Sequence, residues 1–324
     1  SGTTNKLVEI SDYLYKKNPD GANEIINGLE HKYMQVIDEL YSTDEYKQRA
    51  TEIVKSHFDY IRSFTKDLFT LFEEKVILAQ GELMSTAMVN LYLNETGVKS
   101  VLIPALDYMR TDKNAEPDPV YIKTKLKDLL SVNPDAPIYI TQGYICRNAY
   151  GEIDNLQRGG SDYSASLIGA AIQADEIQIW TDIDGMHNND PRFVKNTSPV
   201  RYLHFEEAAE LAYFGAKILH PTCILPAKLN NIPVRLLNTM EPEAPGTLIY
   251  NQSEPGKIKA VAAKDGITAI KIKSGRMLLA YGFLRKVFEI FESYQTAIDM
   301  VTTSEVGVSV TIDNTKHLTE ILDD

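Results

Sequence analysis

The feature that most constrains the fold of this chain is the alternation of strand-like and helix-like segments that begins after Gly97. Two runs rich in β-branched residues, 98–106 (VKSVLIPAL) and 137–145 (PIYITQGYI), are bounded by proline or glycine and predict buried strands. Residues 164–174 (SASLIGAAIQA) have the apolar spacing of a helix, and 176–183 (EIQIWTDI) predict the next strand. This succession is the unit of parallel sheets, so we expect an α/β fold.

The alternation continues along the chain and is preceded by a long helical region. Residues 205–221 predict a helix with acidic residues in its first turn, and 231–238 predict the strand that follows it. Residues 6–96 place apolar side chains at three- and four-residue spacings among charges, which predicts several helices. Gly97 is then expected to cap the last of these helices.

A turn-rich stretch separates two parts of the sequence. Residues 238–257 contain three prolines and two glycines, and we interpret them as a domain boundary. Beyond it, the pattern predicts strand, helix, strand, strand and helix, which is a ferredoxin-like order lacking its last strand. A length of 324 residues also favours two domains.

Charge and composition exclude several classes of partner. A formal charge of −12 argues against non-specific binding to nucleic acid or to an anionic membrane surface. Two cysteines cannot build a disulfide framework, which favours a reducing, cytoplasmic compartment. The sequence shows neither a signal-peptide pattern nor an unbroken apolar run of spanning length, so we expect a soluble protein that does not bind membranes.

The most informative local motif is 155–166 (NLQRGGSDYSAS). The glycine pair at 159–160 lets the backbone approach a ligand, and a helix beginning near Ser161 presents free N–H groups to an anion. Arg158 can bind a carboxylate or phosphate through two donors. On the local pattern alone, an ordinary turn with Ser161 as helix cap and Asp162 as a first-turn acid is an equally good interpretation.

Three further segments contain candidate residues of weaker individual weight. Thr181 and Asp182 follow a predicted strand, where open α/β sheets bind ligands, although residues 180–192 would also suit a polar surface loop. Taken alone, the positive charge of Lys217 near the C-terminal end of a predicted helix only interacts favourably with the helix dipole. Glu82, taken alone, is interpreted as an acidic residue at the start of a helix. Phosphate-loop, dinucleotide-binding and zinc-protease motifs are absent, and the six histidines lack metal-ligand spacing, so no metal site is expected.

Taken together and in order, these motifs resemble those of the aspartokinases, a branch of the amino acid kinase family. The matching segments are SGTTN (1–5), GELMS (81–85), RGGSD (158–162), WTDIDG (180–185), DPR (190–192) and FGAKILHP (214–221). The resemblance implies a three-layer α/β/α sandwich of the carbamate kinase-like type over residues 1–250, followed by a partial ferredoxin-like ACT regulatory domain over 251–324. It also implies ATP-dependent phosphorylation of the L-aspartate side-chain carboxylate to 4-phospho-L-aspartate, the first step of lysine, threonine and methionine biosynthesis.

The same resemblance implies a role for individual residues. Arg158 and Asp162 are expected to be catalytic, with Arg158 bound to a substrate carboxylate and Asp162 organising cationic groups. The expected aspartate site consists of Thr4, Glu82, Tyr144, Arg158, Ser161 and Asp162, in which Glu82 would bind the ammonium group. The expected nucleotide site consists of Thr181, Asp182, His187, Arg192 and Lys217, with Mg²⁺ bound mainly through the phosphates of ATP. His187 stands where the family often has tyrosine.

The C-terminal segments 274–291 and 298–310 resemble the lysine-sensitive aspartokinases that have a single activity. The resemblance implies feedback inhibition by L-lysine, a homodimer formed through ACT domains and an effector site across the subunit interface. The implied effector residues are Met277, Tyr281, Gly282, Phe283, Leu284, Asp299 and Ser304.

The resemblance also implies that family segments lie outside the chain. The family's KFGGTS strand, which supplies a catalytic lysine, would precede Ser1, and a second ACT repeat would follow the last residue. We therefore expect this chain to be truncated at both ends, with little kinase activity and weakened dimerisation. The alternatives are a non-catalytic amino-acid-sensing module and another amino acid kinase, such as one acting on acetylglutamate; Glu82, as an ammonium partner, argues against an N-acylated substrate.

Overall fold

The structure is a computed structural model that describes residues 2–66, 68–156, 160–213, 221–252, 258–273, 281–304 and 306–324. The chain divides into two compact units, residues 1–261 and 262–324. Three of the predicted site residues, Arg158, Lys217 and Met277, lie outside the described residues.

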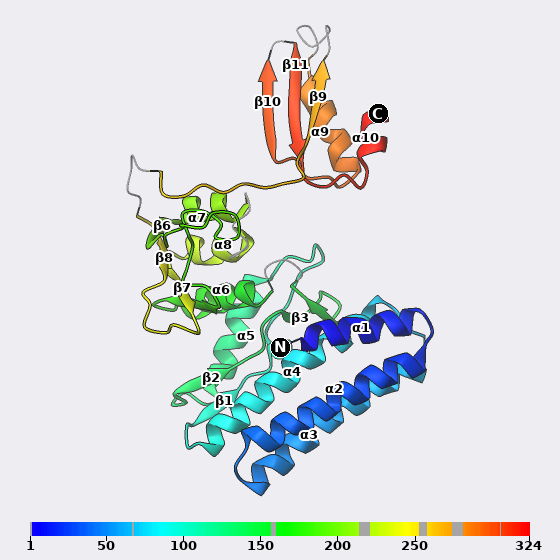
Figure 1. The fold of residues 1–324 in the computed structure, drawn as a ribbon, viewed down its shortest axis with the longest axis vertical. Helices are drawn as coiled ribbons and strands as arrows, with labels where there is room; N and C mark the ends of the chain where they lie inside the picture. The colour runs from blue at the N-terminus through cyan, green and yellow to red at the C-terminus, as the bar shows by residue number, and fades with distance from the viewer. Residues whose placement is uncertain are drawn as a thin grey trace. The chain divides into compact units, whose positions relative to one another are not determined.

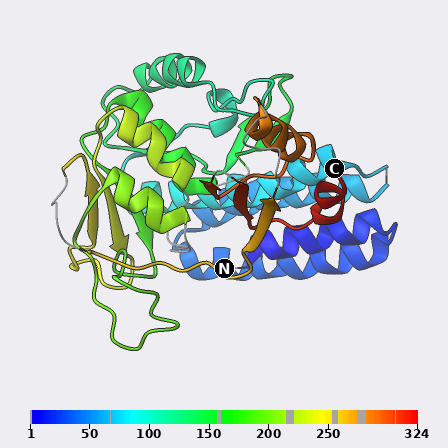
Figure 2. The same ribbon diagram turned by 90° about the horizontal axis from the view of Figure 1, so that it is seen from above.

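Four helices form the first part of the larger unit, as the sequence predicts: α1 (Thr3–Tyr15), α2 (Pro19–Leu40), α3 (Asp44–Ser63, followed by the 3₁₀ turn η1, Phe64–Lys66) and α4 (Leu71–Glu95). Figures 1 and 2 show them packed lengthwise against one another. Asn18 caps α2 by accepting a hydrogen bond from the N–H of Gly21, and Thr70 caps α4 in a capping box with Glu73. Apolar residues on one face of each helix, such as Leu7, Ile26 and Phe58, form a shared buried core.

Helix α4 continues through the motif that the sequence analysis took as a helix start. Gly81 and Glu82 lie in the middle of this helix. Gly81 leaves room for the neighbouring helix α1, since a Cβ on Gly81 would lie 3.1 Å from Leu7 Cδ1. Over the described residues, α4 is the helix long and apolar enough to cross a membrane by length and composition. Buried residues such as Ile77 and Met84 belong to the core shared with the other helices.

The rest of the larger unit contains several small sheets covered by helices. Its elements are β1 (Ser100–Leu102), the 3₁₀ turn η2 (Ala105–Asp107), α5 (Pro119–Ser131), β2 (Ile138–Ile140), β3 (Ile145–Arg147), β4 (Ile153–Asn155), α6 (Gly160–Ile172), β5 (Ile177–Thr181), β6 (Tyr202–His204), α7 (Phe205–Tyr213), α8 (Pro221–Leu229), β7 (Val234–Asn238) and β8 (Thr247–Tyr250). Strands β1 and β2 pair in parallel, β3 and β4 form an antiparallel hairpin, and the largest sheet has the order β5-β7-β8-β6. The parallel pairing of β5 with β7 confirms the α/β alternation expected from the sequence.

One part of the predicted boundary segment 238–257 belongs to this sheet. Strand β8 pairs antiparallel with β7, so the eight residues 239–246 that join the two strands form a connection within the sheet. Gly246 permits the close approach of this connection to β7, because it has a φ of +63° and an added Cβ would lie 1.9 Å from the Leu236 carbonyl oxygen. Residues 238–250 of the predicted boundary segment therefore belong to the larger unit, which extends to Val261.

The smaller unit has the predicted order of elements: β9 (Thr268–Lys273), α9 (Phe283–Ser293), β10 (Met300–Ser304), β11 (Gly307–Ile312) and α10 (Leu318–Asp323). Its antiparallel sheet has the order β10-β11-β9. Alternate residues of β11 are buried with residues of α9 and α10 such as Val287 and Ile321, so both helices pack on one face of the sheet (Figure 1). All five residues of the edge strand β10 are exposed.

Candidate functional site

The start of α6 and the end of β5 lie at the same edge of the larger unit. A short turn joins the two elements, which pack side by side and must therefore run in opposite directions. A helix of 13 residues and a strand of 5 residues have similar lengths, roughly 20 and 17 Å. This places Asp162, in the first turn of α6, at the edge where Thr181 ends β5. Parallel sheets bind ligands at this carboxyl edge.

The loop before β3 is packed tightly against the start of α6. A Cβ on Gly143 would lie 2.8 Å from Ser161 Cβ, so only glycine permits this approach. The N–H of Tyr144 donates to Ser164 Oγ at 2.9 Å. Tyr144 has a φ of +69°, which is a strained conformation for a residue with a side chain. Strain of this kind concentrates at functional sites, and Tyr144 is a predicted substrate residue.

Two carboxylates of the site, Glu82 and Asp162, are half-buried. Burial raises the pKa of Glu82 and, likewise, the pKa of Asp162. Within the described parts of the chain, neither carboxylate accepts a hydrogen bond or forms an ion pair. A half-buried carboxylate without a counter-charge is costly, so both residues are suited to a positively charged ligand or side chain.

The charge of Glu82 acts on two of the tyrosines of the larger unit. Burial first, and then the negative charges of several neighbours including Glu82, raise the pKa of Tyr144. Burial and the charge of Glu82 also raise the pKa of Tyr33, against the lowering effect of its hydrogen bond with Thr3. A Cβ on Gly81 would lie 3.4 Å from Thr3 Cγ2, so the start of α1 lies beside the turn of α4 that contains Glu82, and Thr4 is exposed there. The structure thus brings Glu82, Tyr144 and the start of α1 together.

Gln142 is a structural residue of this site that the sequence analysis missed. Its side chain is buried, accepts a hydrogen bond from the Ala105 N–H at 2.7 Å and donates to Thr86 Oγ1 at 2.7 Å. Thr86 in turn donates to the Glu82 carbonyl oxygen, one helical turn away. The only signal in the sequence was a glutamine inside an otherwise apolar strand-like run.

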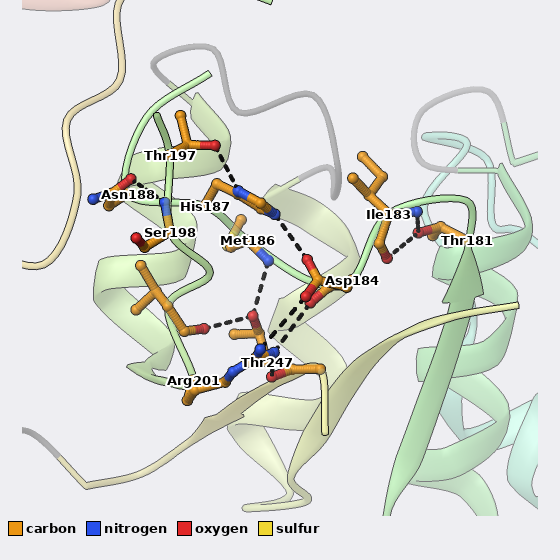
Figure 3. A network of polar contacts seen from close by, with 12 residues as sticks. Thr181, Ile183, Asp184, Met186, His187, Asn188, Thr197, Ser198, Arg201 and Thr247 are labelled. Carbon is orange, nitrogen blue, oxygen red and sulfur yellow. Dashed lines mark hydrogen bonds and ion pairs between the residues drawn. The ribbon is translucent and has the colours of Figure 1, made fainter. Parts of the chain in front are cut away.

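The loop after β5 is held by an internal network of polar contacts (Figure 3). The Thr181 hydroxyl accepts from the Ile183 N–H at 3.1 Å, which turns the chain away from the strand, and Asp182 is exposed. His187 is bound through both ring nitrogens, to Asp184 Oδ1 and to Thr197 Oγ1, each at 2.8 Å.

Arg201 and Arg192 occupy different positions in this loop. The Arg201 guanidinium donates to the Gly246 carbonyl oxygen at 3.1 Å and lies 3.5 Å from Asp184 Oδ2 (Figure 3), whereas Arg192 binds Asp190 and is exposed. Among the described residues, no group of histidine, cysteine and carboxylate side chains could hold a metal ion.

The predicted effector residues divide into two groups in the smaller unit. Tyr281 and Gly282 lie at the start of α9, where Phe283 and Leu284 form its first turn, and Tyr281 is fully exposed. Strands β9 and β10 run in the same direction because each pairs antiparallel with β11. The end of β10, with Ser304, therefore lies near the start of α9. Asp299 precedes the other end of β10, roughly 17 Å away.

Comparisons with known proteins place the chain in a family. The sequence profile described as "Amino acid kinase family" matches residues 6–238. The chain is 34% identical to "Aspartokinase 1, chloroplastic" of Arabidopsis thaliana over 97% of its own length and 57% of the relative's. It is 38% identical to "Lysine-sensitive aspartokinase 3" of Escherichia coli K12, over 74% of this chain and 54% of that one. The chain thus spans a little over half the length of these curated relatives.

Solved structures give the same result for the fold. The structure of E. coli aspartokinase III in complex with aspartate and ADP is 31% identical, has a TM-score of 0.82 and is matched over 97% of this chain and 70% of that one. The complex of the same enzyme with lysine and aspartate is 30% identical, with a TM-score of 0.76 over 100% of this chain and 75% of that one. These likenesses confirm the expected α/β fold of the amino acid kinase type.

Proposed function

The chain belongs to the amino acid kinase family, and we propose that it carries the activity of an aspartokinase. The reaction transfers the terminal phosphoryl group of ATP to the side-chain carboxylate of L-aspartate and yields 4-phospho-L-aspartate. The observation that carries this proposal is the pair of half-buried carboxylates, Glu82 and Asp162, which lack a counter-charge among the described residues. The likeness to relatives named aspartokinases supports it.

The chemistry demands charge and position more than acid–base catalysis. The aspartate side chain has a pKa near 4 in water, so it is already ionised at neutral pH and needs no general base. The difficulty is to bring this anion up to a triphosphate, which requires positive charge around the transferred group. We assign Arg158 to a substrate carboxylate, Glu82 to the substrate ammonium group and Asp162 to the organisation of cationic groups.

Further residues complete the proposed aspartate site. Ser161 offers the free N–H groups of a helix start, where an anion is stabilised. Tyr144 is fixed beside that helix start by its bond to Ser164, and Thr4 belongs to the helix that adjoins Glu82. We infer that these groups shape the pocket for aspartate while the two charged residues, Arg158 and Glu82, select it.

The proposed nucleotide site lies at the carboxyl edge of β5. It consists of Thr181, Asp182, His187, Arg192 and Lys217, with Lys217 and Arg192 facing phosphates. His187 is bound by Asp184 and Thr197, so its contribution would be to hold the loop in shape. Mg²⁺ would be bound mainly through the phosphates of ATP. When bound, it would neutralise charge on the transferred group.

The smaller unit is proposed to be an ACT domain that binds L-lysine as an inhibitor. Its effector residues are Met277, Tyr281, Gly282, Phe283, Leu284, Asp299 and Ser304. Asp299 is too far from Ser304 and the start of α9 to join them around one amino acid in a single copy. A homodimer in which a second copy supplies Asp299 would complete the site. We further propose a cytoplasmic location, because a chain with only two cysteines cannot build the disulfide framework typical of secreted proteins.

The decisive experiment measures acyl-phosphate formation by the full-length protein, trapped as a hydroxamate, with L-aspartate and with N-acetyl-L-glutamate. We expect activity with aspartate alone, and a loss of at least about 100-fold in Glu82→Gln because the ammonium group loses its partner. Activity with the N-acylated substrate would favour a different amino acid kinase. Saturable lysine binding without turnover of any acid would favour the non-catalytic sensing module.

A further inference from the structure

A pocket that contains two arginines lies at the tip of the β3–β4 hairpin. It has a volume of about 250 Å³ and is lined by residues of the 106–110 segment, α5 and the hairpin turn. Two of its lining residues are arginines, Arg110 and Arg147. Arg147 lies at the opposite end of β3 from Tyr144, so this pocket is distinct from the proposed aspartate site.

The backbone places the two arginines directly beside each other. Arg110 and Arg147 are partners in a parallel β-bridge, with hydrogen bonds from the Thr111 N–H to the Arg147 carbonyl oxygen and from the Arg147 N–H to the Met109 carbonyl oxygen, each at 2.9 Å. Bridged residues lie about 4.8 Å apart and present their side chains to the same side. Like charges in such a pair are destabilising unless something compensates them.

A carboxylate compensates the charge of Arg110. Arg110 donates to Asp118 Oδ2 at 2.5 Å, and its guanidinium stacks over the Tyr121 ring at 3.7 Å. This partnership holds the pKa of Asp118 below its usual range.

Arg147 has a different environment. Its guanidinium donates to two carbonyl oxygens, of Leu106 at 3.0 Å and of Gly151 at 2.7 Å, and pairs with no carboxylate among the described residues. The nearby acid Glu152 instead accepts a hydrogen bond from the Asn148 side chain.

We propose that this pocket binds a small oxyanion, a phosphate or carboxylate group of a metabolite, with Arg147 as its main partner and Arg110 as the second. The anion supplies the negative charge that the arginine pair lacks. Guanidinium groups suit this role because their N–H donors match the geometry of carboxylate and phosphate oxygens. The exposed ring of Tyr150, at 77% exposure, borders the opening and could cover the rest of such a ligand. The proposal does not depend on the kinase activity.

The test uses a matched pair of variants at Ala149, an exposed residue that lines the pocket. Ala149→Glu supplies an internal carboxylate to the arginine pair, whereas Ala149→Gln adds a side chain of the same size without charge. Both variants leave the hydrogen bonds of Arg147 in place. Inorganic phosphate and succinate are titrated separately into the full-length protein at constant ionic strength, and binding is measured by calorimetry and by the shift in melting temperature.

We expect at least one of the two anions to bind the wild type and Ala149→Gln saturably, and to bind Ala149→Glu at least about tenfold more weakly. Arg147→Gln should weaken binding equally, whereas Arg49→Gln, which removes a surface arginine paired with Glu45, should not. Saturation by phosphate alone or by succinate alone would identify the group that is bound. Equal binding by the two Ala149 variants, or no saturation by either anion up to about 50 mM, would overturn the proposal; should Arg147→Gln not fold, the Ala149 pair decides.

Discussion

An ion pair between α4 and the β3–β4 hairpin offers the sharpest test of how the fold holds the proposed aspartate site. Lys75 Nζ lies 2.7 Å from Asp154 Oδ1, and the two side chains are only 18% and 15% exposed. Lys75 precedes Glu82 by two helical turns on the same helix, and Asp154 lies in the strand that leads to residues 157–159. We predict that Lys75→Met destabilises the protein and displaces the hairpin.

The expected magnitude follows from the burial of the pair. Removing one partner of a fully buried pair costs about 3–5 kcal/mol, whereas exposed pairs contribute about 0.2–1 kcal/mol. Lys75 and Asp154 lie between these limits, so we expect Lys75→Met to lower the free energy of unfolding by about 2 kcal/mol. The coupling free energy of a cycle with Asp154→Asn should be about 1.5 kcal/mol, because the double variant leaves no unpaired charge.

A second ion pair provides the matched control. Lys6 and Glu9 lie at nearly the same distance, 2.6 Å, but are 50% and 39% exposed. The corresponding cycle with Lys6→Met and Glu9→Gln should give a coupling below about 0.5 kcal/mol because water screens this pair. The difference between the cycles then measures the effect of burial at a constant distance.

The assay combines urea unfolding with kinetics of the full-length protein. A lower midpoint at an unchanged urea dependence would report lost stability without a change in the unfolded state. Because Tyr144 begins the hairpin, the KM for aspartate should rise severalfold, with a smaller change in kcat. Equal coupling in the two cycles, or a cost below about 0.5 kcal/mol for Lys75→Met, would refute the reasoning.

Three further predictions concern single positions. Because burial raises the pKa of Glu82, the native state holds this proton more tightly than the unfolded chain, and stability falls as the pH rises from the ordinary glutamate value through the raised one. Glu82→Gln should remove this fall, so urea unfolding at pH 8 should show that the variant is more stable than the wild type, although it is inactive. A variant less stable than the wild type at pH 8 would contradict the raised pKa of Glu82. Gly246→Ala should cost at least about 3 kcal/mol in thermal unfolding, because strain at positive φ adds to a clash with a backbone oxygen, whereas Gly97→Ala, with φ +83° and no atom within 4 Å, should cost about 1 kcal/mol. Co-expressed Asp299→Ala and Ser304→Ala chains should regain about a quarter of the lysine sites, because about half of the randomly paired dimers are mixed and each mixed dimer has one intact site of two; no recovery of lysine inhibition would argue against a site shared between copies.

The sequence predicted the elements whose signal is local, and missed those whose cause lies elsewhere in the chain. The runs 98–106 and 176–183 contain strands because their β-branched residues suit a buried sheet. The β3–β4 hairpin has strands of only three residues and carries too short a pattern to be recognised. Gly81 suggested a helix start. The side chain of Leu7 approaches position 81 closely and favours glycine there, and this contact is not visible in the local sequence.

The same limit applied to the candidate site. Around residues 158–162 the local pattern fitted an anion site and an ordinary turn equally well. The close packing of Gly143 on Ser161 and the strained backbone of Tyr144 add two observations that a simple turn does not require. Neither could be predicted, because the residues in contact are about 18 positions apart in the sequence.

The pattern of paired and unpaired charges gives a more general argument for the location of the site. Two other half-buried carboxylates of the larger unit have a cationic partner: Asp154 pairs with Lys75, and Glu176 pairs with Arg235 at 2.8 Å. The fold itself compensates these two charges. Glu82 and Asp162 depart from this pattern within the described residues, and they do so at the edge where α6 begins. Burying a carboxylate without a cationic partner costs free energy. Where the described residues leave that cost uncompensated, we infer a site whose positive charge comes from the substrate or from residues such as Arg158.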